Sequence, residues 1–126
     1  MAWELNSDRP IYSQILEKIQ TRIICGIYQP GERLPSVREL AAEASVNPNT
    51  MQRALSELEH SGLIITQRSS GRMVTENTQM IQSTKREIAI AEIKAFFANM
   101  HELGYSSEEI LQLINENQPR SDALTQ

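Results

Sequence analysis

Two helix-start signals lie only eleven residues apart in this chain of 126 residues, and they constrain its fold more than any other feature. Ser36 is followed by Glu39 in the spacing of a capping box, in which each side chain satisfies a backbone amide at the other residue. Asn47 and Pro48 combine a capping residue with a proline suited to a first helical turn. Because only about three residues remain between the two helices, they must meet at a sharp angle, which predicts a helix-turn-helix.

Another helix is predicted before this pair. Asp8 and Pro10 are typical of a helix start, in which Asp8 would cap the free backbone amides and Pro10 would lie in the first turn. Four isoleucines then recur at every fourth position between polar residues, which predicts an amphipathic helix: Ile11, Ile15, Ile19 and Ile23. Gly26 ends this helix, and Pro30-Gly31 predicts a turn that leaves residues 32–34 room only for a stub of extended chain.

A β-hairpin is predicted directly after the helix that begins at Asn47. Gly62 ends that helix, and residues 63–67 are rich in β-branched side chains. The residues Ser69-Ser70-Gly71 are typical of a turn, and residues 73–75 can return as a second strand. Helix, stub, helix, turn, helix and hairpin in this order predict a winged helix-turn-helix domain over residues 1–76, large enough to bury one modest core.

Residues 77–126 predict a second, helical domain. A long helical stretch is broken by Gly104, and Ser106 with Glu109 forms a second capping box that opens a last helix. A tail of about 50 residues is too short to enclose a cavity, but two amphipathic helices can pair with a copy of themselves. We therefore expect a homodimer. The Ile, Phe and Met residues from Ile81 to Leu103 could alternatively form helix core or line a ligand pocket. The expected dimerisation residues are Ile88, Ile93, Phe96, Phe97, Met100, Ile110, Leu111 and Ile114. The expected fold class is mainly α with a small β-hairpin, a winged helix-turn-helix followed by a short two-helix C-terminal dimerisation segment.

Three segments at fixed spacing carry a resemblance to a known family: residues 30–41 (PGERLPSVRELA), 46–50 (VNPNT) and 54–59 (ALSELE). They resemble the GntR family of bacterial transcription regulators over about residues 10–75. The two-helix tail resembles the YtrA subfamily, whose members lack large effector domains, dimerise through this tail and often sit beside genes for ABC transporters. The resemblance implies a DNA-binding regulator, which we expect to be a repressor. It also implies operator half-sites that carry GT and AC steps.

The charge of the chain is unevenly distributed. The net charge is −4, but residues 1–75 carry eight basic and eight acidic residues, so the whole negative excess lies in the C-terminal part. A neutral first part can still present a basic face to double-stranded DNA. The acidic tail should face away from the duplex and penalise weak non-specific binding.

The expected DNA-binding residues come from both helices of the helix-turn-helix and from the hairpin. The later helix should enter the major groove with the polar side chains that lie off its Met51, Leu55 and Leu58 stripe. The resemblance implies that Arg38 donates to a guanine edge, and its planar fork matches the O6 and N7 acceptors. The full set is Ser36, Arg38, Asn47, Asn49, Thr50, Gln52, Arg53, Arg68, Ser70, Gly71 and Arg72.

Each of these residues also has a simpler interpretation. The polar positions of the later helix could form a solvated face, and Arg38 could pair with Glu39 or Glu43 at the surface. Ser36 and Asn47 could act as caps, with or without a DNA phosphate at the helix ends. Arginines beside a hairpin tip also occur in proteins that bind nothing.

Other function classes receive little support from the sequence. An interaction module that docks protein should show apolar residues in place of the outward arginines. An enzyme built around Cys25 lacks a recognisable base or resolving thiol, and we expect Cys25 to be a packed apolar residue. No metal-ligand spacing or cofactor motif is present, no apolar run is long enough to span a membrane, and the lack of an apparent secretory signal favours the cytoplasm. An effector, if one exists, is not indicated.

Overall fold

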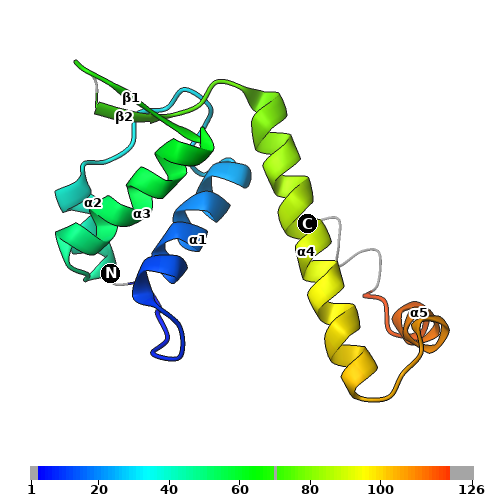
Figure 1. The fold of residues 1–126 in the computed structure, drawn as a ribbon. Helices are drawn as coiled ribbons and strands as arrows, with labels where there is room; N and C mark the ends of the chain where they lie inside the picture. Colours follow the sequence, from blue (N-terminus) through cyan, green and yellow to red (C-terminus); the bar gives the residue numbers. More distant parts are fainter. Residues whose placement is uncertain (1–2, 70, 120–126) are drawn as a thin grey trace. The chain divides into compact units, whose positions relative to one another are not determined.

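The computed structural model describes residues 3–69 and 71–119, which form a series of helices interrupted by one β-hairpin (Figure 1). Its element order confirms the predicted fold class, mainly α with a small hairpin. The elements are α1 (Ile11–Ile24), α2 (Val37–Ala44), α3 (Pro48–Ser61), β1 (Ile64–Gln67), β2 (Gly71–Val74), α4 (Thr78–Glu102) and α5 (Ser107–Glu116).

The chain forms two compact units, Met1–Lys85 and Arg86–Gln126. The first unit extends beyond the predicted end of the DNA-binding domain at residue 76. Met80 and Ile81, near the start of α4, pack against its core, and Ile81 is only 5% exposed. The helix α4 therefore begins inside the first unit and continues into the second.

The core of the first unit is built from the apolar faces of α1, α2, α3 and the hairpin. The α1 residues Ile15, Ile19 and Ile23 are buried, as the fourfold spacing predicts, and α1 packs along α3 (Figure 1). Burying each large aliphatic side chain contributes about 1.5 to 3 kcal/mol. The other main members are Leu40, Ala41, Ala44, Met51, Ala54, Leu55, Leu58, Leu63, Ile64 and Val74. This core fixes α3 by its apolar stripe and leaves the polar face of α3 in solvent.

Local chemistry sets both the start of α2 and the turn between α2 and α3. Ser36 Oγ accepts a hydrogen bond from the Glu39 amide at 3.1 Å, and Glu39 Oε1 accepts one from the Ser36 amide at 2.9 Å, which confirms the capping box. Ser45 ends α2 in the left-handed conformation, with φ 59°, and the Val46 amide donates back to the Ala41 carbonyl at 3.0 Å. The chain therefore reverses within a few residues, and the predicted helix-turn-helix is confirmed.

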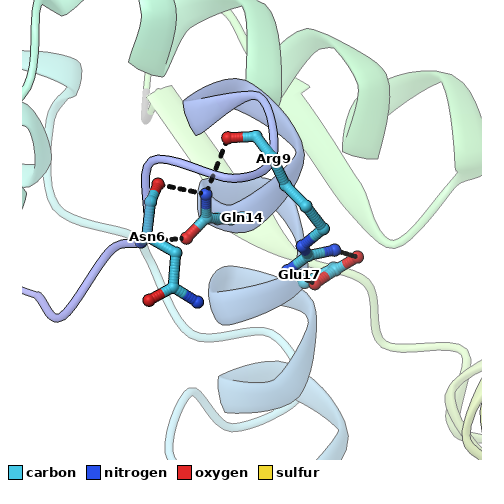
Figure 2. A network of polar contacts seen from close by, with 4 residues as sticks. All are labelled: Asn6, Arg9, Gln14 and Glu17. Atoms are coloured by element: carbon cyan, nitrogen blue, oxygen red, sulfur yellow. Dashed lines mark hydrogen bonds and ion pairs between the residues drawn. The ribbon is translucent and has the colours of Figure 1, made fainter.

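The start of α1 differs from the prediction. Pro10 precedes the helix, and no side chain caps it at the N-cap position, so the expected role of Asp8 is wrong. The buried Gln14 side chain organises this end instead: its Nε2 donates to the carbonyls of Asn6 and Arg9 at 2.8 and 2.9 Å, and its Oε1 accepts from the Asn6 amide at 2.7 Å (Figure 2). One amide side chain thus attaches the preceding segment to α1.

The hairpin is attached to the stub that precedes α2. The strands β1 and β2 are antiparallel, with a register from Ile64 opposite Val74 to Gln67 opposite Gly71. Arg33 forms a β-bridge with Met73, and the Leu34 amide donates to the Arg72 carbonyl at 2.9 Å. The predicted stub is confirmed, and it forms an edge beside β2 that leads directly to the cap of α2.

The second unit consists of most of α4, a turn and α5. Gly104, with φ 101°, follows α4 in a conformation that favours glycine. Ser106 and Glu109 form the predicted capping box at the start of α5. Ile110 is fully buried within the chain, whereas several other apolar side chains of this unit are exposed.

Candidate nucleic-acid interface

The first unit carries all the predicted DNA-binding residues, on α2, on the first turns of α3 and on the hairpin. Most of their side chains are exposed, and Thr50 and Arg72 are half-buried. Ser70 lies outside the described residues. The described members fall on three elements: Ser36 and Arg38 at α2, Asn47, Asn49, Thr50, Gln52 and Arg53 at α3, and Arg68, Gly71 and Arg72 at the hairpin.

Arg38 is exposed on α2, and none of the ion pairs among residues 3–69 and 71–119 involves it. Both acids that were considered as its partners are engaged elsewhere. Glu39 holds the Ser36 amide, and this backbone hydrogen bond lowers the pKa of Glu39. Glu43 accepts from Trp3 Nε1 at 2.8 Å and from Arg22 Nη1 at 2.9 Å, and these bonds, that of Trp3 foremost, lower the pKa of Glu43. The alternative of a surface pair for Arg38 is therefore wrong.

Each of the two cap residues keeps a hydrogen-bond donor that its capping bond does not use. Ser36 uses its hydroxyl oxygen as an acceptor from Glu39, so its hydroxyl proton is still available to donate. Asn47 Oδ1 accepts from the Asn49 amide at 2.7 Å, which leaves the Asn47 amino group as a donor. Capping is confirmed for both residues and is compatible with a phosphate at either helix end.

The exposed face of α3 contains amide and guanidinium groups. Asn49 and Gln52 are exposed, and Thr50 is half-buried. Arg53 is also exposed, but its Cζ lies 4.1 Å from the centroid of the Tyr12 ring of α1. The side chains on this face differ accordingly: Asn49 and Gln52 extend into solvent, and Arg53 is held against an aromatic ring.

The hairpin arginines occupy different environments. Arg68 lies exposed in the turn after β1. Arg72 Nε donates to Glu59 Oε1 at 3.0 Å, and the Thr66 hydroxyl donates to the other oxygen of the same carboxylate. Burial raises the pKa of Glu59, but the hydrogen bonds from Thr66 and Arg72 outweigh it and the net shift is downward. Arg72 therefore attaches the hairpin to the last turns of α3, which corrects the expectation of four freely outward arginines.

Sequence reasoning missed two residues that belong to this surface. Arg33 is exposed on the stub and borders a groove between the stub, the start of α2 and the hairpin. Its place inside the PGERLPS segment was the available signal. Tyr12 was missed because nothing in the spacing of α1 links it to α3. The groove is lined by Arg33, Leu34, Pro35, Ser36, Val37, Glu39, Thr66, Gly71 and Arg72.

The predicted dimerisation residues of the second unit also divide into two groups. Ile93, Phe96, Leu111 and Ile114 are 56%, 43%, 54% and 36% exposed, and Ile88, Phe97 and Met100 are half-buried. Ile110 is 0% exposed, so it is a core residue of its own unit and is not open to a partner. A groove with mainly apolar lining contains Phe96, Met100, Leu113, Ile114, Asn117, Gln118 and Pro119.

Outside these surfaces, the prediction for Cys25 is wrong. Cys25 is exposed rather than packed, because α1 ends at Ile24 and Cys25 is its C-cap. Within residues 3–69 and 71–119, no three His, Cys, Asp or Glu side chains are grouped as a metal site would require. No helix of that part of the chain is long and apolar enough to cross a membrane.

Comparison with known proteins identifies the family. The family model of bacterial regulatory proteins of the gntR family matches residues 11–74, from the start of α1 to the end of the hairpin. The chain belongs to this family. GntR-family proteins are DNA-binding transcriptional regulators, and this assignment confirms the resemblance carried by residues 30–59.

Relatives of this GntR-family regulator match both of its units. The Bacillus subtilis (strain 168) protein YhcF, an uncharacterized HTH-type transcriptional regulator, is 38% identical over 109 residues, covering 86% of this chain and 90% of YhcF. The HTH-type transcriptional repressor YtrA of the same organism is 37% identical over 112 residues, covering 87% of this chain and 85% of YtrA. A solved GntR-family transcriptional regulator from Listeria monocytogenes has a TM-score of 0.83 and 38% identity, covering 90% of this chain and all of that chain.

Proposed function

We propose that this GntR-family regulator is a repressor that binds an inverted-repeat DNA operator as a homodimer. The observation that carries the proposal is the distribution of side chains between the units. The first unit has exposed Arg38 and Arg68 together with an exposed polar face on α3, and the second unit has exposed apolar side chains.

The arrangement around α3 supports sequence-specific binding. Its leading residues Asn49, Thr50, Gln52 and Arg53 carry the donors and acceptors that read base edges and phosphates. Arg38 presents from α2 a guanidinium that no ion pair among the described residues uses, and Arg68 and Gly71 flank the hairpin tip that would follow the backbone or probe the minor groove. A dimer that neutralises on the order of 6 to 10 phosphates should lose affinity steeply as salt rises.

The exposed apolar side chains of the second unit support dimerisation. Ile93 and Leu111 are more than half exposed. Contact between such large apolar side chains and water does not stabilise the unit. Pairing with a second copy would bury them. Twofold symmetry would then present two α3 helices to one face of the duplex, so the half-sites should be inverted and separated by one or more helical turns.

The repressor role is supported by similarity to YtrA, which is named a transcriptional repressor and is 37% identical. Occupying an operator is the simplest mechanism for a regulator that combines a DNA-binding unit with a unit that pairs two copies. We further propose that the protein acts in the cytoplasm, where bacterial DNA lies. Its operators would carry GT and AC half-site steps, and its targets would include an ABC transporter operon.

A protein-docking role for the winged domain is less well supported. Such a module should present an apolar patch where this unit presents Arg38 and Arg68. The matching relatives are named transcriptional regulators, and none of them is described as an enzyme.

The proposal is tested by selecting bound duplexes from a random DNA pool with the purified full-length chain. We expect one palindromic sequence to be enriched, with half-sites about one or more helical turns apart. Sedimentation of the chain with and without the enriched duplex should give two protomers per duplex. No enrichment, or enrichment of a single asymmetric half-site by a monomer, would refute the proposal.

A further inference from the structure

Arg53 of α3 is held by a ring from another helix. The Arg53 Cζ lies 4.1 Å from the centroid of Tyr12, in the first turn of α1. Tyr12 is half-buried and packs against the core cluster of the first unit, so its ring is fixed by the packing of that cluster. An exposed arginine on α3 is therefore oriented by a side chain that belongs to the rigid core.

The contact leaves the hydrogen-bonding groups of Arg53 available. A guanidinium that lies over a ring uses its face, whereas its five N–H donors point outward in the plane of the group. None of the ion pairs in the described ranges, residues 3–69 and 71–119, includes Arg53. The N–H donors of Arg53 are therefore held in position, and no ion pair among the described residues uses them.

Other arginines of the same unit show what the alternative partner does. Arg9 and Arg72 are each paired with a glutamate at 3.0 Å, and Arg22 is paired with Glu43 at 2.9 Å while its Cζ also lies 4.7 Å from the centroid of the Trp3 ring. A carboxylate orients a guanidinium but cancels its charge, and it competes with any phosphate for the same donors. An aromatic ring orients the group and leaves the charge intact. If this contact served only to pack α1 against α3, an exposed arginine would not be required.

We propose that Tyr12 is a positioning residue that holds Arg53 ready to donate to a DNA phosphate beside the groove that α3 enters. This inference rests on the proposed function, since it assumes that α3 binds DNA. Arg53 lies one helical turn after Asn49 on the exposed face of α3, and its contact with Tyr12 holds its guanidinium on the side toward α1, where a phosphate contact suits it better than a base contact. Tyr12 acts through Arg53 and need not contact DNA.

The test uses the full-length chain and the duplex enriched by selection, with dissociation constants measured by fluorescence anisotropy at several salt concentrations. Loss of a cation–π contact of this kind should weaken the affinity about twofold to fivefold for each protomer. Tyr12→Leu should therefore weaken operator binding about fivefold to thirtyfold for the dimer. Tyr12→Phe keeps the ring and should restore binding to within about twofold. Arg53→Gln should reduce the salt slope by about 0.9 for each protomer, while base preferences stay unchanged.

A double-mutant cycle separates positioning from a general effect on the fold. In the Arg53→Gln background, Tyr12→Leu should have no further effect on affinity. Arg53→Lys, at an exposed position, keeps the charge but loses the planar contact and should also weaken binding. The inference is refuted if Tyr12→Leu weakens both backgrounds equally, or if Arg53→Lys binds like the unmodified chain. If the unmodified chain enriches no duplex at all, the operator proposal itself fails and this inference fails with it.

Discussion

Replacing Arg38 by alanine should separate DNA recognition from folding. Arg38 is exposed, and the acids nearest to it in sequence are engaged by Ser36, Trp3 and Arg22, so its removal breaks no contact that stabilises the fold. We expect the free energy of unfolding to change by no more than about 0.5 kcal/mol. A guanidinium that binds a guanine edge contributes about 1 to 3 kcal/mol of discrimination, so each half-site should lose roughly 5- to 150-fold in preference at one base pair.

The assay is an anisotropy titration of Arg38→Ala against the selected operator and a panel of operators with single base-pair changes, all at one salt concentration. Lys18→Ala is the matched control, because it removes one exposed positive charge from the same unit outside the predicted reader set. The control should keep full base discrimination, whereas Arg38→Ala should become indifferent at one symmetric pair of positions. Unchanged discrimination at every base pair would remove Arg38 from the base-reading set.

Three further predictions concern the elements that support the interface. Ser36→Ala removes the capping oxygen of α2 and should lower the free energy of unfolding by about 1 kcal/mol in urea titrations; an unchanged midpoint would contradict the capping role. The pKa of Glu43 is lowered, so its stabilisation is complete above the ordinary value of 4.5 and is lost as pH falls through the lowered folded-state pKa. Glu43→Gln should therefore be less stable than the unmodified chain at pH 7, and the difference in melting temperature should shrink below pH 4.5; a difference that does not vary with pH would exclude the charge as its cause. Ile93→Glu, at a side chain that is 56% exposed, should keep the melting temperature of the first unit but sediment as a monomer and bind the operator more weakly; a dimer of unchanged stability would place the interface elsewhere.

The predictable parts of this structure depend on neighbours in the sequence. The capping boxes at Ser36 and Ser106, the cap at Asn47 and the turn at Gly62 each require residues no more than three positions apart, and all of them form as expected. The isoleucine spacing of α1 likewise identifies its buried face. Local chemistry is therefore sufficient for the order of elements and for the positions of the candidate readers on them.

The remaining features depend on partners brought together by packing. Arg72 binds Glu59 across 13 positions of sequence, and Trp3 binds Glu43 across 40, so no local pattern indicates which arginine stays free. Ile110 and Leu111 are adjacent apolar residues of one short helix, yet one is buried and the other is 54% exposed. Composition cannot distinguish a residue that packs within its own unit from one that faces solvent or a second copy.

The hairpin is fixed as far as the Thr66–Arg72 pair, on one side by the stub at residues 31–34 and on the other by the Glu59 carboxylate of α3. Gly71, near its free end, has φ 75°, a conformation that favours glycine, although a Cβ there would meet no atom of the described residues within 4 Å. Doubling the length of such a loop costs only about 0.6 kcal/mol in closure entropy. Insertions in this turn can therefore accumulate with little penalty to folding as long as Gly71 is kept, which makes the turn the part of the domain where new operator preferences can evolve while α2 and α3 keep theirs.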